Sequence, residues 1–66
     1  MLGKAIKAAR KAAHLTQRQL GEKLGFTGRT AEVTIQKWEH DLRDPAVEQL
    51  RPLAKALGIT LEELIP

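Results

Sequence analysis

Amide, ammonium and apolar side chains share one face of a helix that the sequence predicts after Thr30. At 100° per residue, this face carries Val33, Gln36, Lys37 and His40. Glutamine can pair with adenine, lysine can donate to guanine O6 or N7, and valine can contact a thymine methyl group. A helix that is held rigidly and presents these groups outward suits the major groove of double-stranded DNA.

Glu32 lies at the rim of the same face, in the first turn of the predicted helix. Its carboxylate can accept a hydrogen bond from cytosine N4, or it can stabilise the positive end of the helix dipole. The sequence favours neither role over the other. The predicted base-reading set is therefore Glu32, Val33, Gln36 and Lys37.

The opposite side of the predicted helix carries Ala31, Ile35, Trp38 and Leu42. Because Trp38 lies on the same stripe as Ile35, we expect it in a small core and not stacked on a base. The chain has one Trp, one Phe and no Tyr, so the rest of the core must be aliphatic.

The length of 66 residues allows one small domain, spanning residues 1–66. The net charge of +3 is compatible with a polyanionic partner. No apolar run approaches the roughly 20 residues of a membrane span, and residues 1–7 do not form a signal-peptide core. With no Cys in the chain, we expect a cytoplasmic protein that is associated with the nucleoid when bound to DNA.

Catalysis and cofactor binding are not expected from this composition. The chain has no Cys and no Tyr, and its two histidines, His14 and His40, fall at the ends of predicted helices. A metal site needs more ligands than these two side chains offer. Gly25 and Gly28 lack the spacing of a phosphate-binding loop. We therefore predict no enzyme activity, no metal and no cofactor.

Helical periodicity and capping residues indicate two helices in the first part of the chain. The first covers about residues 3–13, with a basic stripe opposite its apolar positions. Thr16 and Gln19 have the spacing of a capping box that begins the second helix, and Gly25 ends it. Gly21 inside this helix predicts a close approach of the next helix.

The connection to the third helix is predicted over residues 26–30, with Thr30 as the N-cap. We expect this helix to end at His40 or Asp41. Residues 42–45 are predicted to form a loop, because the residue before a proline avoids helical geometry.

A fourth helix is predicted to end at Gly58, with an apolar face of Val47, Leu50, Leu53, Ala54 and Leu57. Pro52 removes one backbone donor, so we expect either a kink there or a regular helix only from about Arg51. Thr60 and Glu63 form a second capping box, which begins a short fifth helix. No strand pattern occurs, and the predicted fold class is all-α with five short helices.

An ordered set of residues matches the pattern of a known family: Arg10, Leu15-Thr16-Gln17, Leu20, Leu24-Gly25, Ile35, Trp38-Glu39, Pro45, Leu50, residues 53–59 and Leu64. From about residue 6 to residue 65 the chain resembles the Cro/repressor-type, XRE-like helix-turn-helix family. The resemblance implies a lambda-repressor-like DNA-binding domain whose second and third helices form the helix-turn-helix. It also implies a phage Cro-like protein or small repressor that binds a palindromic operator as a homodimer.

For individual residues, the resemblance implies that Gln17 contacts a phosphate. It also implies that Arg10 and Glu39 pair across the first and third helices as structural residues, like Trp38 in the core. Two departures from the family pattern stand out: the connection before the third helix is about four residues longer than usual, and Gly21 stands where the family often has Ala or another small residue. A milder difference is Asp41, which replaces the usual Gly after the third helix.

Contacts with the DNA backbone are predicted around the base-reading face. Arg29 and Arg43 are expected in the loops that flank the third helix, and solvated side chains remain the alternative for both. The full predicted set is Gln17, Arg18, Arg29, Thr30, Thr34, His40 and Arg43. An antitoxin or protein-interaction module of the same fold remains the alternative function, with exposed apolar residues 61–65 contacting a toxin or a second copy of the chain.

Overall fold

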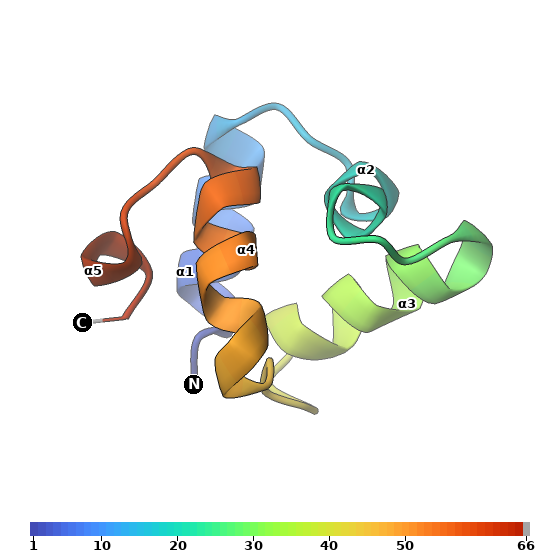
Figure 1. Ribbon diagram of the computed structural model, residues 1–66. Coiled ribbons are helices and arrows are strands. Elements are labelled where there is room, and N and C mark those ends of the chain that lie inside the picture. The colour runs from blue at the N-terminus through green and yellow to red at the C-terminus, as the bar shows by residue number, and fades with distance from the viewer. Residues whose placement is uncertain (66) are drawn as a thin grey trace.

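The computed structural model describes residues 1–65, which form five α-helices and no strand (Figure 1). The helices are α1 Gly3–Ala12, α2 Gln17–Lys23, α3 Gly28–Glu39, α4 Val47–Leu57 and α5 Leu61–Leu64. In Figure 1, α2 and α3 lie on one side of α4 and α5 lies on the other. Within residues 1–65, no helix is both long and apolar enough to cross a membrane. The all-α prediction is confirmed.

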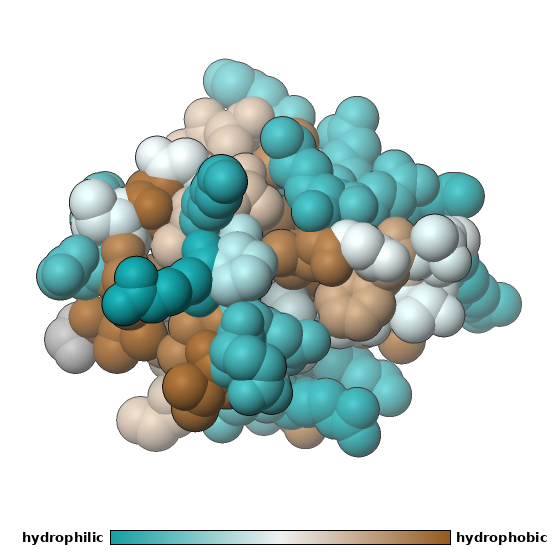
Figure 2. All heavy atoms as spheres, in the orientation of Figure 1, coloured by the Kyte–Doolittle hydropathy of each residue, from teal (hydrophilic) through white to brown (hydrophobic). Residues whose placement is uncertain are grey.

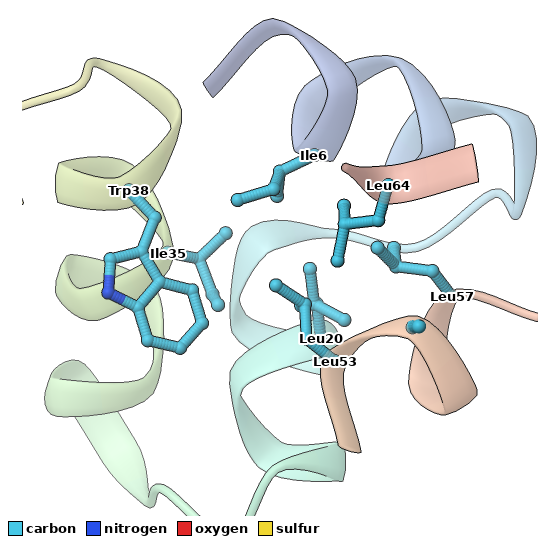
Figure 3. Packing of buried hydrophobic residues seen from close by; sticks show 8 residues of the cluster. Ile6, Leu20, Ile35, Trp38, Leu53, Leu57 and Leu64 are labelled. Atoms are coloured by element: carbon cyan, nitrogen blue, oxygen red, sulfur yellow. The ribbon is translucent and has the colours of Figure 1, made fainter. Parts of the chain in front are cut away.

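Side chains from all five helices meet in one core (Figure 3). Trp38 is 2% exposed, and Phe26 packs edge-on against it with ring centroids 6.2 Å apart. The largest fully buried side chains are Ile6, Leu20, Ile35, Leu53 and Leu64. This core holds α3 by the inward stripe predicted for it, through Ala31, Ile35 and Trp38.

Paired hydrogen bonds cap the start of α2. Gln19 N–H donates to Thr16 Oγ1 at 3.0 Å, and Thr16 N–H donates to Gln19 Oε1 at 2.9 Å. These bonds satisfy two amides that would otherwise lack a partner. At the other end, Gly25 has a φ of 95°, and Phe26 N–H donates to Gly21 O at 3.1 Å. Both predicted ends of α2 are confirmed.

Gly21 lets α3 approach α2 closely. A Cβ at this position would lie 2.7 Å from Ala31 Cα and closer still to Ala31 O. Because real Cβ atoms do not come so near to backbone, any side chain here would push the two helices apart. The predicted packing role of this glycine is confirmed.

The third helix begins earlier than the sequence indicated. Thr27, and not Thr30, is the N-cap of α3, and Gly28 has a φ of 58° that turns the chain into the helix. The predicted connection over residues 26–30 is therefore wrong. Residues 28–30 belong to α3, which has 12 residues and is about 18 Å long at 1.5 Å per residue.

The end of α3 falls within a residue of the prediction, with His40 as the C-cap. Asp41 follows with a φ of 57°, and Leu42 N–H donates to Lys37 O at 2.9 Å. Because the left-handed residue breaks the helical phase, Leu42 no longer continues the inward stripe and is 76% exposed. The prediction that Leu42 belongs to the core is wrong.

The fourth helix is continuous from Val47 to Leu57 with Pro52 inside it, so of the two alternatives for Pro52 the late start near Arg51 is wrong. The carbonyl that Pro52 leaves without a partner belongs to Glu48, in the exposed first turn, where water can hydrate it. Val47 is 82% exposed and does not share the buried face predicted for it.

The short α5 completes the core. Glu63 N–H donates to Thr60 Oγ1 at 3.2 Å, and Thr60 N–H donates to Glu63 Oε1 at 3.1 Å, which confirms the second capping box. Leu64 is fully buried, and only the last apolar residue, Ile65, is exposed, at 37%. The exposed apolar surface expected over residues 61–65 is therefore wrong for most of its length.

Candidate nucleic-acid interface

A concavity of about 400 Å³ opens along the outward side of α3. Five α3 residues and one residue of the α3–α4 loop line it: Arg29, Thr30, Val33, Thr34, Lys37 and Arg43. The sequence predicted a DNA contact for all six. Three are cations and two are threonines, and no acid is among them, so the concavity favours an anionic or acceptor-rich ligand. Figure 2 shows hydrophilic side chains gathered over α2 and along the lower edge of α3.

Arg29 lies on α3 itself and not in a flanking loop, which corrects the sequence prediction. Arg29, Val33 and Lys37 follow one another at four-residue spacing, and residues four apart on a helix lie on the same face. Arg29 and Lys37 are exposed, and Val33 between them is half-buried. Among residues 1–65, neither cation forms an ion pair.

A second stripe of α3 carries Glu32, Gln36 and His40, again at four-residue spacing, and all three are exposed. The four residues predicted to read bases are thus divided between two adjacent stripes. Val33 and Lys37 line the concavity, whereas Glu32 and Gln36 lie beside it. Both stripes lie away from the buried side of the helix.

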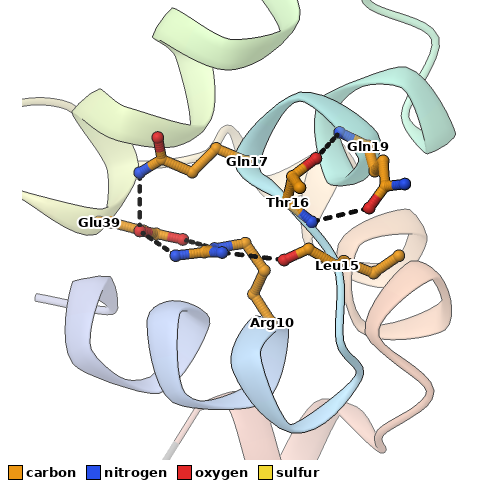
Figure 4. A network of polar contacts seen from close by, with 6 residues as sticks. All are labelled: Arg10, Leu15, Thr16, Gln17, Gln19 and Glu39. Carbon is orange, nitrogen blue, oxygen red and sulfur yellow. Dashed lines mark hydrogen bonds and ion pairs between the residues drawn. The ribbon is translucent and has the colours of Figure 1, made fainter.

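A buried ion pair holds the end of α3 against α1 (Figure 4). Arg10 Nε donates to Glu39 Oε2 at 2.6 Å, and Arg10 Nη2 donates to Glu39 Oε1 at 3.3 Å. The two side chains are 12% and 2% exposed. Arg10 Nη1 also donates to Leu15 O at 2.9 Å, in the segment before α2. The pair that the family resemblance implies is present, and it ties together α1, the entry to α2 and the end of α3.

Gln17, the first residue of α2, joins the same carboxylate. Its Nε2 donates to Glu39 Oε1 at 3.1 Å, a contact that sequence reasoning missed. An amide nitrogen carries two hydrogens, so one N–H serves Glu39 and the other can serve a ligand. In Figure 4 the Gln17 carbonyl oxygen points away from Glu39. The buried ion pair therefore orients the side chain expected to contact phosphate.

Arg18 is the other α2 residue with a predicted backbone contact. Its Nε donates to Glu22 Oε2 at 3.4 Å, and the two side chains are 59% and 50% exposed. An exposed pair of this kind contributes little free energy. The pair with Glu22 therefore leaves Arg18 able to turn toward a phosphate.

Asp41 links the end of α3 to the start of α1, which sequence reasoning also missed. Its Oδ1 accepts from the Met1 α-ammonium at 2.6 Å and from Gly3 N–H at 3.0 Å. The Met1 hydrogen bond, followed by the Gly3 hydrogen bond, lowers the pKa of the Asp41 carboxyl. Aspartate tolerates the left-handed conformation better than most residues with a Cβ. Asp41 therefore ends α3 through its left-handed backbone conformation, and its carboxylate caps the start of α1.

The described residues hold no group of three or more His, Asp or Glu side chains that could bind a metal ion. His14 and His40 are exposed, next to the ends of α1 and α3. In the same part of the chain, every buried side-chain nitrogen and oxygen has a hydrogen-bond partner. No orphaned polar group therefore marks a second ligand site among these residues.

A fold of five short helices, with α2 packed closely on α3 and a cationic face on α3, is that of a helix-turn-helix DNA-binding domain. The model of the helix-turn-helix family HTH_3 matches residues 6–64. The chain therefore belongs to this Cro/repressor-type, XRE-like family and is a DNA-binding helix-turn-helix regulator. No curated protein and no solved structure gives a significant match.

Proposed function

We propose that this protein is a sequence-specific transcriptional regulator, of the phage Cro-like or small-repressor type, that inserts α3 into the major groove of double-stranded DNA. The observation that carries the proposal is the acid-free concavity in which Arg29, Lys37 and Arg43 surround Val33. Arg29 and Arg43 at its borders neutralise phosphates, while Val33 and Lys37 meet base edges. The regulator acts where DNA is held, in the cytoplasm on the nucleoid.

Sequence is read from the two outward stripes of α3. Gln36 pairs with adenine, Lys37 donates to guanine, and Val33 contacts a thymine methyl group. Glu32 is exposed in the first turns of the helix, where its carboxylate can accept from cytosine N4. These four side chains differ in what they accept and donate, so together they distinguish base pairs.

The DNA backbone is contacted at the borders of these stripes. Arg43 approaches from the α3–α4 loop, and Gln17 approaches from α2 with its amide held by Glu39. Phosphate contacts of this kind set the register of the helix and carry no sequence information themselves. The remaining members of this predicted set are Arg18, Arg29, Thr30, Thr34 and His40.

We place a homodimer on a palindromic operator. A single α3 is about 18 Å long and spans about half of a 34 Å helical repeat of DNA. A site made of two half-sites therefore needs two copies of the protein. Leu42 and Val47 are 76% and 82% exposed in and just after the loop that carries Arg43. Two copies on neighbouring half-sites would shield these apolar side chains from water.

Selection of bound sites from a random DNA pool tests the proposal. A regulator of this type enriches a few palindromes whose half-sites lie about 34–36 Å apart, and its log affinity falls linearly with log salt. Equal binding to all sequences would contradict specific reading. The alternative, an antitoxin or protein-interaction module of the same fold, can bind DNA as well, and the observation that distinguishes it is copurification with a protein partner.

A further inference from the structure

We infer that each protomer reads two guanines in its half-site, one with Arg29 and one with Lys37, and a thymine methyl group between them with Val33. This inference rests on the proposed function and names the sequence feature that the concavity selects. It changes the role of Arg29, which the sequence alone placed in a loop beside phosphates. The structure puts its side chain on the outward stripe of α3.

The spacing of the two cations fixes the spacing of the guanines. Arg29 and Lys37 are eight residues apart on α3, which corresponds to about 12 Å along the helix axis. Base pairs are about 3.4 Å apart along the DNA axis, and a helix in the major groove lies oblique to that axis, so this distance spans about two to four base pairs. Val33 is midway, about 6 Å from each cation. Its apolar tip therefore meets the base pairs between the two guanines.

The chemistry of the two side chains selects guanine. Arginine and lysine carry only hydrogen-bond donors. Guanine presents two neighbouring acceptors in the major groove, O6 and N7, whereas adenine pairs its N7 with a donor amine. Since neither Arg29 nor Lys37 is held by an ion pair among residues 1–65, both are able to reach these acceptors.

The surroundings of the concavity separate base contacts from phosphate contacts. Arg43 comes from the loop at the border of the concavity, where it can neutralise the backbone. Arg29 lies in the first turn of α3, and the N-terminal residues of recognition helices are those that reach base edges. Lys37 lies in the last turn of α3, on the same stripe and in the same concavity as Arg29, so the two cations face the groove at two levels, with the border contact left to Arg43.

The experiment replaces single guanines of the selected operator with 7-deazaguanine, which lacks only the N7 acceptor. Affinity is measured for the full chain and for Arg29→Ala, Lys37→Ala and Lys55→Ala. Lys55 lies on α4 outside the concavity, so its variant removes the same charge elsewhere. We expect two guanines, about two to four base pairs apart, at which the replacement weakens binding roughly tenfold. Arg29→Ala should abolish the sensitivity at one of them, and Lys37→Ala at the other.

The result that overturns the inference is specific binding without this pattern. If selected half-sites lack guanines at this spacing, or if Arg29→Ala weakens binding equally on all sequences and keeps the 7-deazaguanine effect, Arg29 contacts phosphate and not a base. In either case the proposed regulator stands. Failure to enrich any site from the pool would instead remove the proposed function itself.

Discussion

Removing the Glu39 carboxylate should unfold most of the protein at moderate denaturant concentrations. Glu39→Ala leaves the Arg10 guanidinium, which is 12% exposed, without its charged partner, and it also releases the Gln17 amide. Breaking a buried ion pair in this way costs about 3–5 kcal/mol. A chain of 66 residues has a free energy of unfolding of only about 3–10 kcal/mol. The variant therefore loses between a third and all of its stability.

Urea denaturation followed by the fluorescence of Trp38 measures this loss, because the indole is buried in the core and Trp38 is next to Glu39 in α3. The matched control is Glu22→Ala, which breaks the exposed pair with Arg18 and should change stability by no more than about 0.5 kcal/mol. A second comparison replaces both members of the buried pair, as Arg10→Met with Glu39→Met. The double variant should be more stable than Glu39→Ala, because no buried charge is left alone.

The reasoning would be refuted if Glu39→Ala unfolded within about 0.5 kcal/mol of the unchanged protein. It would also be refuted if the double Met variant were less stable than the single one. The first result would mean that Arg10 finds water or another partner without difficulty. The second would mean that Arg10 without Glu39 still contributes more, through its hydrogen bond to the Leu15 carbonyl and its packing, than its unpaired charge costs.

Four further outcomes follow from the same structure. Trp38→Ala should lose about 3–5 kcal/mol and leave the chain largely unfolded by circular dichroism, and a variant that kept its full helix content would show that the indole is not a core residue. Gly21→Ala should destabilise by about 1–3 kcal/mol in urea, despite the better helix propensity of alanine, because a Cβ collides with the backbone of α3. Gln36→Ala should lose about 1–3 kcal/mol of discrimination between operator and random DNA, whereas Gln17→Ala should weaken both complexes alike; equal behaviour of the two variants in a binding titration would contradict their assigned roles. The lowered pKa of Asp41 means that its charged form stabilises the fold at neutral pH and that this stabilisation is lost as pH falls through that pKa, so the stability gap between the unchanged protein and Asp41→Asn should close in acid.

Much of the fold could be predicted because the local signals coincide with the tertiary ones. Thr16 with Gln19, and Thr60 with Glu63, form caps whose partners are only three residues away, so sequence spacing alone defines them. Gly25 marks a position where only a left-handed residue closes the turn. Such features depend on neighbours in the chain, and short-range arguments therefore find them.

The start of α3 could not be predicted, because two threonines compete for the same role. Thr30 has the residue type of an N-cap, but Thr27 occupies the cap although its side chain makes no capping hydrogen bond. Glycine normally disfavours a helix, but here the positive φ of Gly28 turns the chain into the first turn of α3. The choice is made by packing of α3 on α2, which involves residues far from the cap.

The sequence predicted which residues belong to the candidate site better than it predicted how they are arranged. All six residues around the concavity were expected to contact DNA, but the helical projection assumed one uninterrupted phase. That assumption failed on either side of the helix, for Leu42 after the left-handed Asp41 and for Arg29 before the expected start. The contacts of Glu39 with Gln17 and of Asp41 with Gly3 join distant segments, and no spacing rule encodes them.

The contacts of Asp41 couple the first residues of α1 to the helix that carries the proposed DNA-binding face, although these residues lie outside the helix-turn-helix. A Cβ at Gly3 would lie 2.9 Å from Asp41 Oδ1 and 2.8 Å from the carbonyl carbon of Glu39. Any displacement of α1 is therefore transmitted to the C-terminal end of α3, two residues from the Lys37 that we propose to contact DNA. Substitutions in α1 can thus change the tilt of α3 without altering any side chain of the candidate nucleic-acid interface.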